Sequence, residues 1–373
     1  MLSKLDANLV NCQDEIIDAI IYHNGYYNYK NVDIIKEYPF INAVGVHGKS
    51  ENIKKLSYLA SVSYICSVSK IYNLDYKFSK ITNIENSFNR NRMSIFSYND
   101  NNFHKYTNIM YNSFFNNIKS SNYTACVLDT GVCRHMDLTC INNRLIYQKN
   151  CENDIVYPYD DNGHGTFVAG VIAGNGILSG KKIVGVSPNT NIISVKIMNY
   201  KGESNVFCAL DGMQWIADNY KKYGIKTVCM SFGAVPIEND PLVVGVDALS
   251  KLGIVVVSAS GNSGENTYMS PAISNNVISV GSCDKEGNIS DFTSRGIYNG
   301  KEYPFIYSRG ENVISLSNTG TYVSMSGTSV ACPIICGYVC NLLNKFPNLT
   351  INEVKKHLLK DSKYINNLPI LSI

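Results

Sequence analysis

A turn of small residues, Gly327-Thr328-Ser329-Val330-Ala331-Cys332-Pro333, leads into an apolar helix near the end of this 373-residue chain. Gly327 permits a sharp turn, and Thr328 and Ser329 suit a helix N-terminus. Pro333 is expected within the first turn of the helix, where its missing N–H costs nothing. The free N–H groups of such a helix end favour negative charge beside the serine, as an acyl-transfer nucleophile needs. Most Ser and Thr residues at this place only cap the helix. Other parts of the chain must therefore show whether Ser329 is a nucleophile.

Strands alternate with helices from Tyr123 onward. Apolar, β-rich segments predict strands at 123–128, 191–197, 225–231, 254–258 and 276–281. Helices are predicted to begin near Ser204, at Asp240-Pro241 and at the capping box Thr350-x-x-Glu353. This alternation indicates an α/β fold with a doubly wound, mostly parallel sheet covered by helices on both faces. Functional residues of such sheets gather beyond the carboxyl ends of the strands.

A smaller α+β unit precedes the sheet. Strands are expected at 18–23, 40–47 and 65–71, and helices at 29–38 and 51–64. Residues 83–117 are rich in Asn and aromatic residues, which indicates an exposed linker with a cleavage site. We therefore divide the chain into a small domain (1–95), a linker (96–118) and a large domain (119–373). The alternative is a surface loop inside one continuous domain.

Composition excludes several classes of function. The net charge of +3, without a Lys/Arg cluster, argues against nucleic-acid binding. No apolar run is long enough to span a membrane, and the N-terminus lacks the apolar core of a signal peptide. The chain has twelve cysteines, of which Cys332, Cys336 and Cys340 recur on one helix face. They fit small buried residues better than metal ligands, and free thiols fit a cytoplasmic location.

Four residues beside glycines or at strand ends together supply an acyl-transfer site. Asp129 follows the strand at 123–128, and Asn262 follows the strand at 254–258. His164 stands between two glycines at the start of an apolar segment. With Ser329 they provide a carboxylate, a base, a nucleophile and an oxyanion donor. Each residue alone has an ordinary explanation as a turn, surface or capping residue.

The order Asp, His, Ser and the surrounding motifs resemble those of the subtilisin-like serine proteases (subtilases), above all their intracellular, unexported members. The resemblance rests on Leu128-Asp129-Thr130-Gly131-Val132, on residues 163–170 (GHGTFVAG) and on residues 326–333 (SGTSVACP). Residues 259–262 (ASGN) and 231–233 (SFG) support it. The similarity extends from about Tyr123 to Leu343.

This resemblance implies a role for each residue. Asp129 orients His164, His164 acts as general base and then acid, and Ser329 attacks the peptide carbonyl. Asn262 and the Ser329 backbone N–H stabilise the oxyanion. A substrate peptide, expected to be part of a protein, pairs with two strand segments made of Gly202, Glu203, Ser204, Ser231, Phe232 and Gly233. The small N-terminal unit resembles subtilase propeptides, which assist folding and block the cleft.

The chain departs from the family pattern at a few positions. Phe167 stands where the family usually has His, Val330 replaces Met, and Ser308-Arg309-Gly310 replaces Ala-Pro-Gly. The resemblance places Met269 near the floor of the pocket for the residue before the cleaved bond, where we expect it to narrow that pocket. Residues 174–185 do not resemble the family's calcium loop, so no calcium is inferred there, and the chemistry requires no cofactor.

Together, the sequence features predict a cytoplasmic serine endopeptidase. We expect it to be made as a self-processing zymogen, with its own N-terminal unit as inhibitor. Its substrates are either many proteins or one dedicated precursor. The alternative is a catalytically silent subtilase fold that acts as a binding or regulatory protein.

Overall fold

The computed structural model describes residues 4–13, 15–25, 29–74, 123–140, 142–153 and 159–372, and the backbone of residues 77–79. The predicted linker at 96–118, and the whole of the Asn-rich segment 83–117, lie outside these residues. None of the helices in the described part of the chain is both long and apolar enough to cross a membrane.

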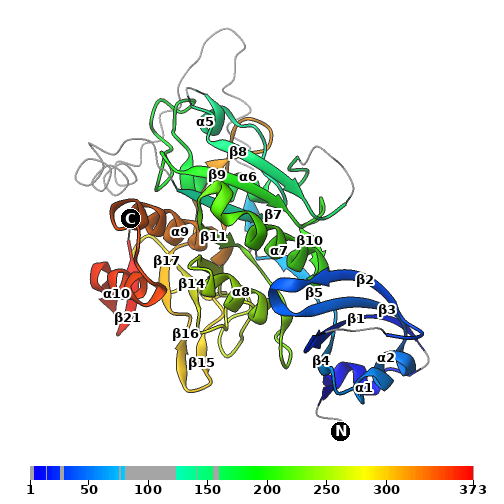
Figure 1. Ribbon diagram of the computed structural model, residues 1–373. Helices are drawn as coiled ribbons and strands as arrows, with labels where there is room; N and C mark the ends of the chain where they lie inside the picture. Colours follow the sequence, from blue (N-terminus) through cyan, green and yellow to red (C-terminus); the bar gives the residue numbers. More distant parts are fainter. Residues whose placement is uncertain are drawn as a thin grey trace.

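A nine-stranded sheet forms the centre of the large domain (Figure 1). In sheet order its strands are β20 (Lys363–Ile365), β21 (Leu368–Leu371), β17 (Ile306–Arg309), β14 (Val277–Cys283), β13 (Val255–Ala259), β11 (Ile225–Met230), β7 (Thr124–Asp129), β9 (Asn191–Lys196) and β8 (Leu145–Asn150). All neighbours are parallel except β20 and β21, which form an antiparallel edge. The predicted α/β fold with a mostly parallel sheet is confirmed.

Helices cover both faces of this sheet. They are α6 (His164–Ala173), α7 (Val206–Tyr223), α8 (Pro241–Lys251), α9 (Thr328–Lys345) and α10 (Ile351–Asp361). Successive residues of β7 point to opposite faces: Leu128 packs in the hydrophobic cluster that contains residues of α7 and α8, and Val127 packs in the cluster of α6 and α9. The central strands are apolar throughout because both of their faces are buried.

The N-terminal unit is a two-layer arrangement of an antiparallel sheet and two short helices. Its sheet has the order β2-β3-β1-β4. The strands are β1 (Ile16–His23), β2 (Asp33–Tyr38), β3 (Ala43–Lys49) and β4 (Val62–Ser67), and the helices are α1 (Ala7–Asn11) and α2 (Ser50–Leu56). Leu9 of α1 and Ile53 of α2 pack in one apolar cluster with alternate residues of the strands.

The prediction of a helix at 29–38 is wrong, because residues 33–38 form β2. This segment contains the β-branched residues Ile34 and Ile35, which favour a strand. It pairs antiparallel with β3, and the aromatic ring of Tyr38 at its end is fully buried. The helix predicted at 51–64 is also shorter than expected, since α2 ends at Leu56.

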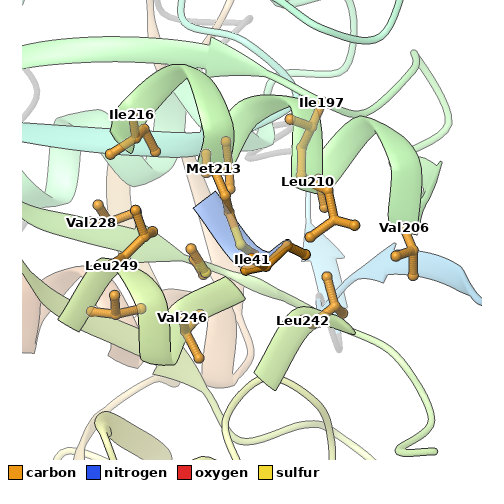
Figure 2. Close-up of a cluster of buried hydrophobic side chains, with 14 of the residues drawn as sticks. Ile41, Ile197, Val206, Leu210, Met213, Ile216, Val228, Leu242, Val246 and Leu249 are labelled. Atoms are coloured by element: carbon orange, nitrogen blue, oxygen red, sulfur yellow. The ribbon is translucent and has the colours of Figure 1, made fainter. Parts of the chain in front are cut away.

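The N-terminal unit packs against α7 and α8 of the large domain (Figure 1). Ile41, in the short 3₁₀ helix η2 (Pro39–Ile41), inserts between the apolar side chains of the two helices, among them Met213 and Val246 (Figure 2). At the edge of this contact, Lys36 Nζ lies 2.7 Å from an oxygen of Asp211. The backbone N–H of Phe40 donates to the Gln214 side chain at 3.2 Å.

Beyond β4, the chain enters the large domain as two short strands. β5 (Lys70–Asn73) lies between β10 (Glu203–Asn205) and β12 (Phe232–Gly233) and is antiparallel to both. β6 (Lys77–Ser79) pairs with β19 (Tyr322–Ser326), whose other edge pairs with β18 (Val313–Leu316). A hairpin of β15 (Gly296–Tyr298) and β16 (Lys301–Tyr303) completes the strands described here.

Candidate active site

Asp129 and His164 meet at the carboxyl edge of the large sheet. Asp129 is the last residue of β7, and His164 is the first residue of α6. The Nδ1 atom of His164 lies 2.7 Å from Oδ1 of Asp129, and both side chains are buried. The Thr130 backbone N–H donates to the same Asp129 oxygen at 2.7 Å. A carboxylate at Nδ1 fixes the ring orientation and keeps that nitrogen protonated, so the other ring nitrogen, Nε2, is left as the base.

A close contact between two backbone segments sets this distance. A β-carbon on Gly165 would lie 2.0 Å from the carbonyl oxygen of Gly131, so only glycine allows the loop after β7 to touch the start of α6. Thr130 completes the contact, since the Gly165 N–H donates to its hydroxyl oxygen at 2.9 Å.

Asp160 holds the same two segments together, although no role was predicted for it. Its side chain is buried and accepts hydrogen bonds from the Thr130 hydroxyl at 2.8 Å and from the Gly163 N–H at 2.7 Å. It also accepts from the backbone N–H and the hydroxyl of Thr166, at 2.8 and 2.6 Å. The acidic pair Asp160-Asp161 before Asn162-Gly163 was the available signal, because Asp commonly accepts hydrogen bonds at helix starts.

Lys196, at the end of β9, is a second residue of the site for which no role was predicted. Its side chain is only 2% exposed. The ammonium donates to the carbonyl oxygens of Thr130 (2.8 Å) and Met198 (2.6 Å) and lies 2.7 Å from Asp161. It therefore ties the loop that carries Asp129 to the strand beside it.

Ser329 is the second residue of α9, directly after Gly327 and Thr328. Pro333 lies inside this helix and not in its first turn as predicted. Since proline has no N–H, the Ser329 carbonyl loses its usual partner four residues later. The Ser231 hydroxyl replaces that partner and donates to the Ser329 carbonyl at 2.9 Å. The departure from regular helix thus ties the backbone of Ser329 to the segment that leads into β12.

The Asn262 side chain is held in one orientation beside Ser329. Its Oδ1 atom accepts from the backbone N–H and the hydroxyl of Thr328, at 3.0 and 2.9 Å. This leaves the amide nitrogen as the outward donor, and it donates to the carbonyl oxygen of Leu74, the residue after β5. An amide that already donates to a peptide carbonyl is suited to stabilise an oxyanion at the same point.

All six residues predicted to bind substrate lie in the two segments that flank β5. Glu203 and Ser204 pair with Tyr72 and Ile71, and Phe232 and Gly233 pair with Asn73 and Tyr72. The carbonyl of Gly202 accepts from the Asn73 N–H at 3.0 Å, and that of Ser231 accepts from the Leu74 N–H at 3.3 Å. The chain's own residues 70–74 thus occupy the groove between β10 and β12 as an extended peptide.

Comparisons with known proteins agree with this geometry. The sequence profile of the subtilase family (Peptidase_S8) matches residues 120–369. The chain belongs to the subtilase family. It is 36% identical over 271 residues to serine protease AprX of Bacillus subtilis, an alignment that covers 64% of this chain and 60% of AprX. It is 33% identical over 245 residues to subtilisin DY of Bacillus licheniformis, covering 64% of this chain and 83% of that protein.

Solved structures show the same fold. A cold-adapted subtilisin-like serine proteinase superposes with a TM-score of 0.59 at 25% identity, and the match covers 69% of this chain and 92% of that one. Because the chain spans only 60% of the length of AprX, likeness to that relative concerns the shared region alone.

Two departures from the subtilase pattern pack in one place. Phe167 and Val330 are fully buried in a small cluster with Met325 between α6, α9 and β19. An apolar ring at 167 needs apolar neighbours, so the branched valine at 330 fits beside it. In this subtilase the two departures therefore form one apolar contact between α6, which begins at His164, and α9, which carries Ser329.

The cysteines on α9 are buried and free, as are Cys126 and Cys229 in the strands. Cys332 Sγ lies 3.7 Å from Cys229 Sγ, and burial raises the pKa of the Cys332 and Cys336 thiols. Within the described residues, no group of three or more His, Cys or acidic side chains is arranged to hold a metal ion. The interpretation of the helix cysteines as small core residues agrees with their burial.

Proposed function

We propose that this subtilase is a serine endopeptidase that uses Asp129, His164, Ser329 and Asn262. His164 takes the proton of the Ser329 hydroxyl while the serine oxygen attacks a peptide carbonyl. The amide of Asn262 stabilises the oxyanion, and His164 then gives its proton to the leaving amine. Water hydrolyses the acyl-enzyme and restores Ser329. The contact between Asp129 and His164, with Asn262 directed at a peptide carbonyl, supports this assignment.

We further propose that the protein is made as a zymogen whose N-terminal domain (1–95) is cleaved by its own active site and inhibits the large domain (119–373). The observation that carries this proposal is β5, which fills the groove between β10 and β12 by strand pairing on both edges. Strand addition is a common way to bind extended peptides, and a segment already paired there excludes other peptides. The linker at 96–118 and a cleavage within 83–117 remain predictions from the sequence.

A cytoplasmic location and protein substrates belong to the same proposal. All twelve cysteines are free, which suits a reducing compartment. The proposed steps use only side chains and water, so they call for no cofactor.

The peptidase assignment is tested by labelling with a fluorophosphonate, which reacts with activated serines. We expect one label on the processed wild-type protein, located at Ser329, and none on the Ser329→Ala variant. An unlabelled wild-type protein that also leaves casein intact would contradict the assignment and favour a binding protein.

The inhibitory role is tested at the ion pair between the two domains. Lys36→Glu replaces the attraction to Asp211 by repulsion, which we expect to weaken the contact by about 1 kcal/mol, or about fivefold in affinity. The lag between self-cleavage and full activity should shorten accordingly. The matched control is Lys55→Glu, which alters a pair with Glu51 inside α2. An unchanged lag in Lys36→Glu, or an equal change in the control, would contradict inhibition through this contact.

A further inference from the structure

The carbonyl of Leu74 lies at the point where an acyl-transfer site needs a substrate carbonyl. It accepts a hydrogen bond from the amide nitrogen of Asn262. A β-carbon on Gly327 would lie 2.6 Å from this oxygen and 2.9 Å from the Ser329 hydroxyl oxygen, so the two oxygens flank the same small space. Of the peptide carbonyls in β5 and the residue after it, that of Leu74 is the one that Asn262 contacts. Leu74 therefore lies where the residue before a cleaved bond would bind.

The side chains of this segment also contact the groove in the way expected of a bound substrate. Leu74 is 7% exposed and packs in a hydrophobic cluster with Met269 against it. A β-carbon on Gly233 would meet the Leu74 and Met269 side chains at 3.3 and 3.2 Å, so glycine leaves the room that Leu74 uses. Ile71, three residues earlier, is fully buried, whereas Tyr72 is 45% exposed. The groove thus contacts two aliphatic side chains, and of the two residues between them Tyr72 remains largely accessible to solvent.

The chain is bound again after Leu74. In β6, Lys77 pairs with Ser326, Phe78 with Met325 and Ser79 with Ser324, antiparallel to β19. Ser326 is three residues before Ser329, and β19 is held from its other side by β18. Backbone hydrogen bonds therefore hold residues 70–74 between β10 and β12, and backbone pairing holds residues 77–79 on β19, the strand that leads to Ser329.

We propose that the first self-cleavage breaks the Leu74–Asp75 bond, which lies inside the domain predicted at 1–95 and before the range 83–117 that the sequence indicated for the cleavage site. We also propose that β19 is a substrate-binding strand for the third to fifth residues after the cleaved bond. The inference rests on the proposed function. The Ser329 oxygen forms an ester with the Leu74 carbonyl carbon, the bond to the Asp75 nitrogen breaks, and that nitrogen leaves with the proton carried by His164. Water then releases the Leu74 carboxylate. The substrates are extended polypeptide segments with Leu before the bond, an aliphatic residue three positions earlier, and at least five residues after it.

The cleaved bond is tested first, from the masses of the pieces of the self-processed protein. We expect an N-terminal piece that ends at Leu74. A protein that cleaves itself at another bond first would overturn this inference and leave the proposed peptidase intact. A protein that neither cleaves itself nor hydrolyses casein would overturn both.

The side-chain part is tested with the decapeptide of residues 70–79 (KIYNLDYKFS) and the processed wild-type protein. We expect replacement of Leu74 by Asp in this peptide to lower kcat/KM by about a hundredfold or more, since a charge would enter an apolar pocket. The matched peptide with Tyr72 replaced by Asp should lose little, because Tyr72 is exposed. Equal losses in the two peptides would overturn the assignment of Leu74.

The role of β19 is tested with N-methylated peptides, which leave the protein unchanged. In an antiparallel pair, successive N–H groups point alternately toward the partner strand and away from it. One of two decapeptides, methylated at the nitrogen of Phe78 or of Ser79, should therefore lose about tenfold in kcat/KM, and the other should not. A peptide shortened to residues 70–76 should lose at least as much. Unchanged rates for both methylated peptides and for the shortened one would overturn the role of β19.

Discussion

Asp160 shows how a residue outside the four predicted catalytic positions fixes the site. Its carboxylate accepts five hydrogen bonds, from Thr130, Asn162, Gly163 and Thr166. Thr130 follows Asp129, and Gly163 precedes His164, so the carboxylate controls the distance between the two. We regard Asp160 as a positioning residue, because its contacts are with the backbone and hydroxyl groups that carry Asp129 and His164.

We expect Asp160→Asn to lower both stability and turnover. The amide nitrogen of Asn cannot accept hydrogen bonds, so buried donors lose their partner at a cost of about 1–3 kcal/mol in the free energy of unfolding. That free energy is measured in the Ser329→Ala background, which prevents self-cleavage. In the active protein kcat should fall and KM should change little, since the described contacts of Asp160 do not include β10 or β12. The control is Asp284→Asn, a partly exposed turn residue whose carboxylate also accepts backbone N–H groups. An unchanged kcat in Asp160→Asn would contradict the positioning role.

The sequence alone pointed to Asp129, His164, Asn262 and Ser329, because each stands at a strand end or helix start within two residues of a glycine. It did not point to Asp160 or Lys196. The contact of Asp160 with Thr130 spans 30 residues of the chain, and those of Lys196 with Asp161 and Thr130 span 35 and 66 residues. Contacts between segments that are distant in the chain produce no local sequence pattern, so these partners could not be predicted.

At the scale of elements, local signals were sufficient where the element is stabilised by its own residues. The capping box predicted at Thr350 and Glu353 is present at the start of α10, with the side chain of each residue bonded to the backbone of the other. The strand β2 was not predicted, because its formation depends on pairing with β3 and not on the spacing of its own apolar residues. Residues 33–37 are exposed, so they show no alternation of buried and exposed positions.

The short helix α5 (Met136–Thr139) gives a prediction about pH. The Nδ1 atom of His135 accepts from the Asp137 N–H at 3.1 Å, and Nε2 lies 3.1 Å from the Thr321 carbonyl oxygen. Nε2 therefore carries the hydrogen and the ring is neutral, and burial lowers the pKa of His135 below its ordinary value. The unfolded chain binds the proton more readily than the folded one. The contribution of neutral His135 to the free energy of unfolding is thus fully present above about pH 6.5. It is lost as the pH falls toward the lowered pKa of the folded state.

We test this with His135→Asn, which keeps a side-chain oxygen for the Asp137 N–H but does not titrate. In the Ser329→Ala background, the free energy of unfolding should fall less between pH 7 and pH 5 in the Asn variant than in the parent protein. Other groups titrate equally in both proteins, so the difference isolates His135. Parallel pH profiles would contradict the neutral state of the ring.

At the scale of the whole molecule, two separate contacts hold the N-terminal unit. One lies on α7 and α8, around Ile41 and Lys36, and the other is the pairing of β5 in the groove. A chain cut after Leu74 would keep both contacts, so cleavage alone does not open the groove. The sequence indicated a small unit before the sheet and the residues of the groove. It did not give the register of residues 70–79, which depends on pairing with strands that are more than 130 residues away.

The central claim is that this subtilase cleaves itself with Ser329. Intact mass spectrometry of purified wild-type protein and of Ser329→Ala tests it most directly. We expect wild-type protein as two pieces and the variant as one uncut chain. If both proteins are whole, or if both are cut at the same bond, the account of a self-processing zymogen is contradicted.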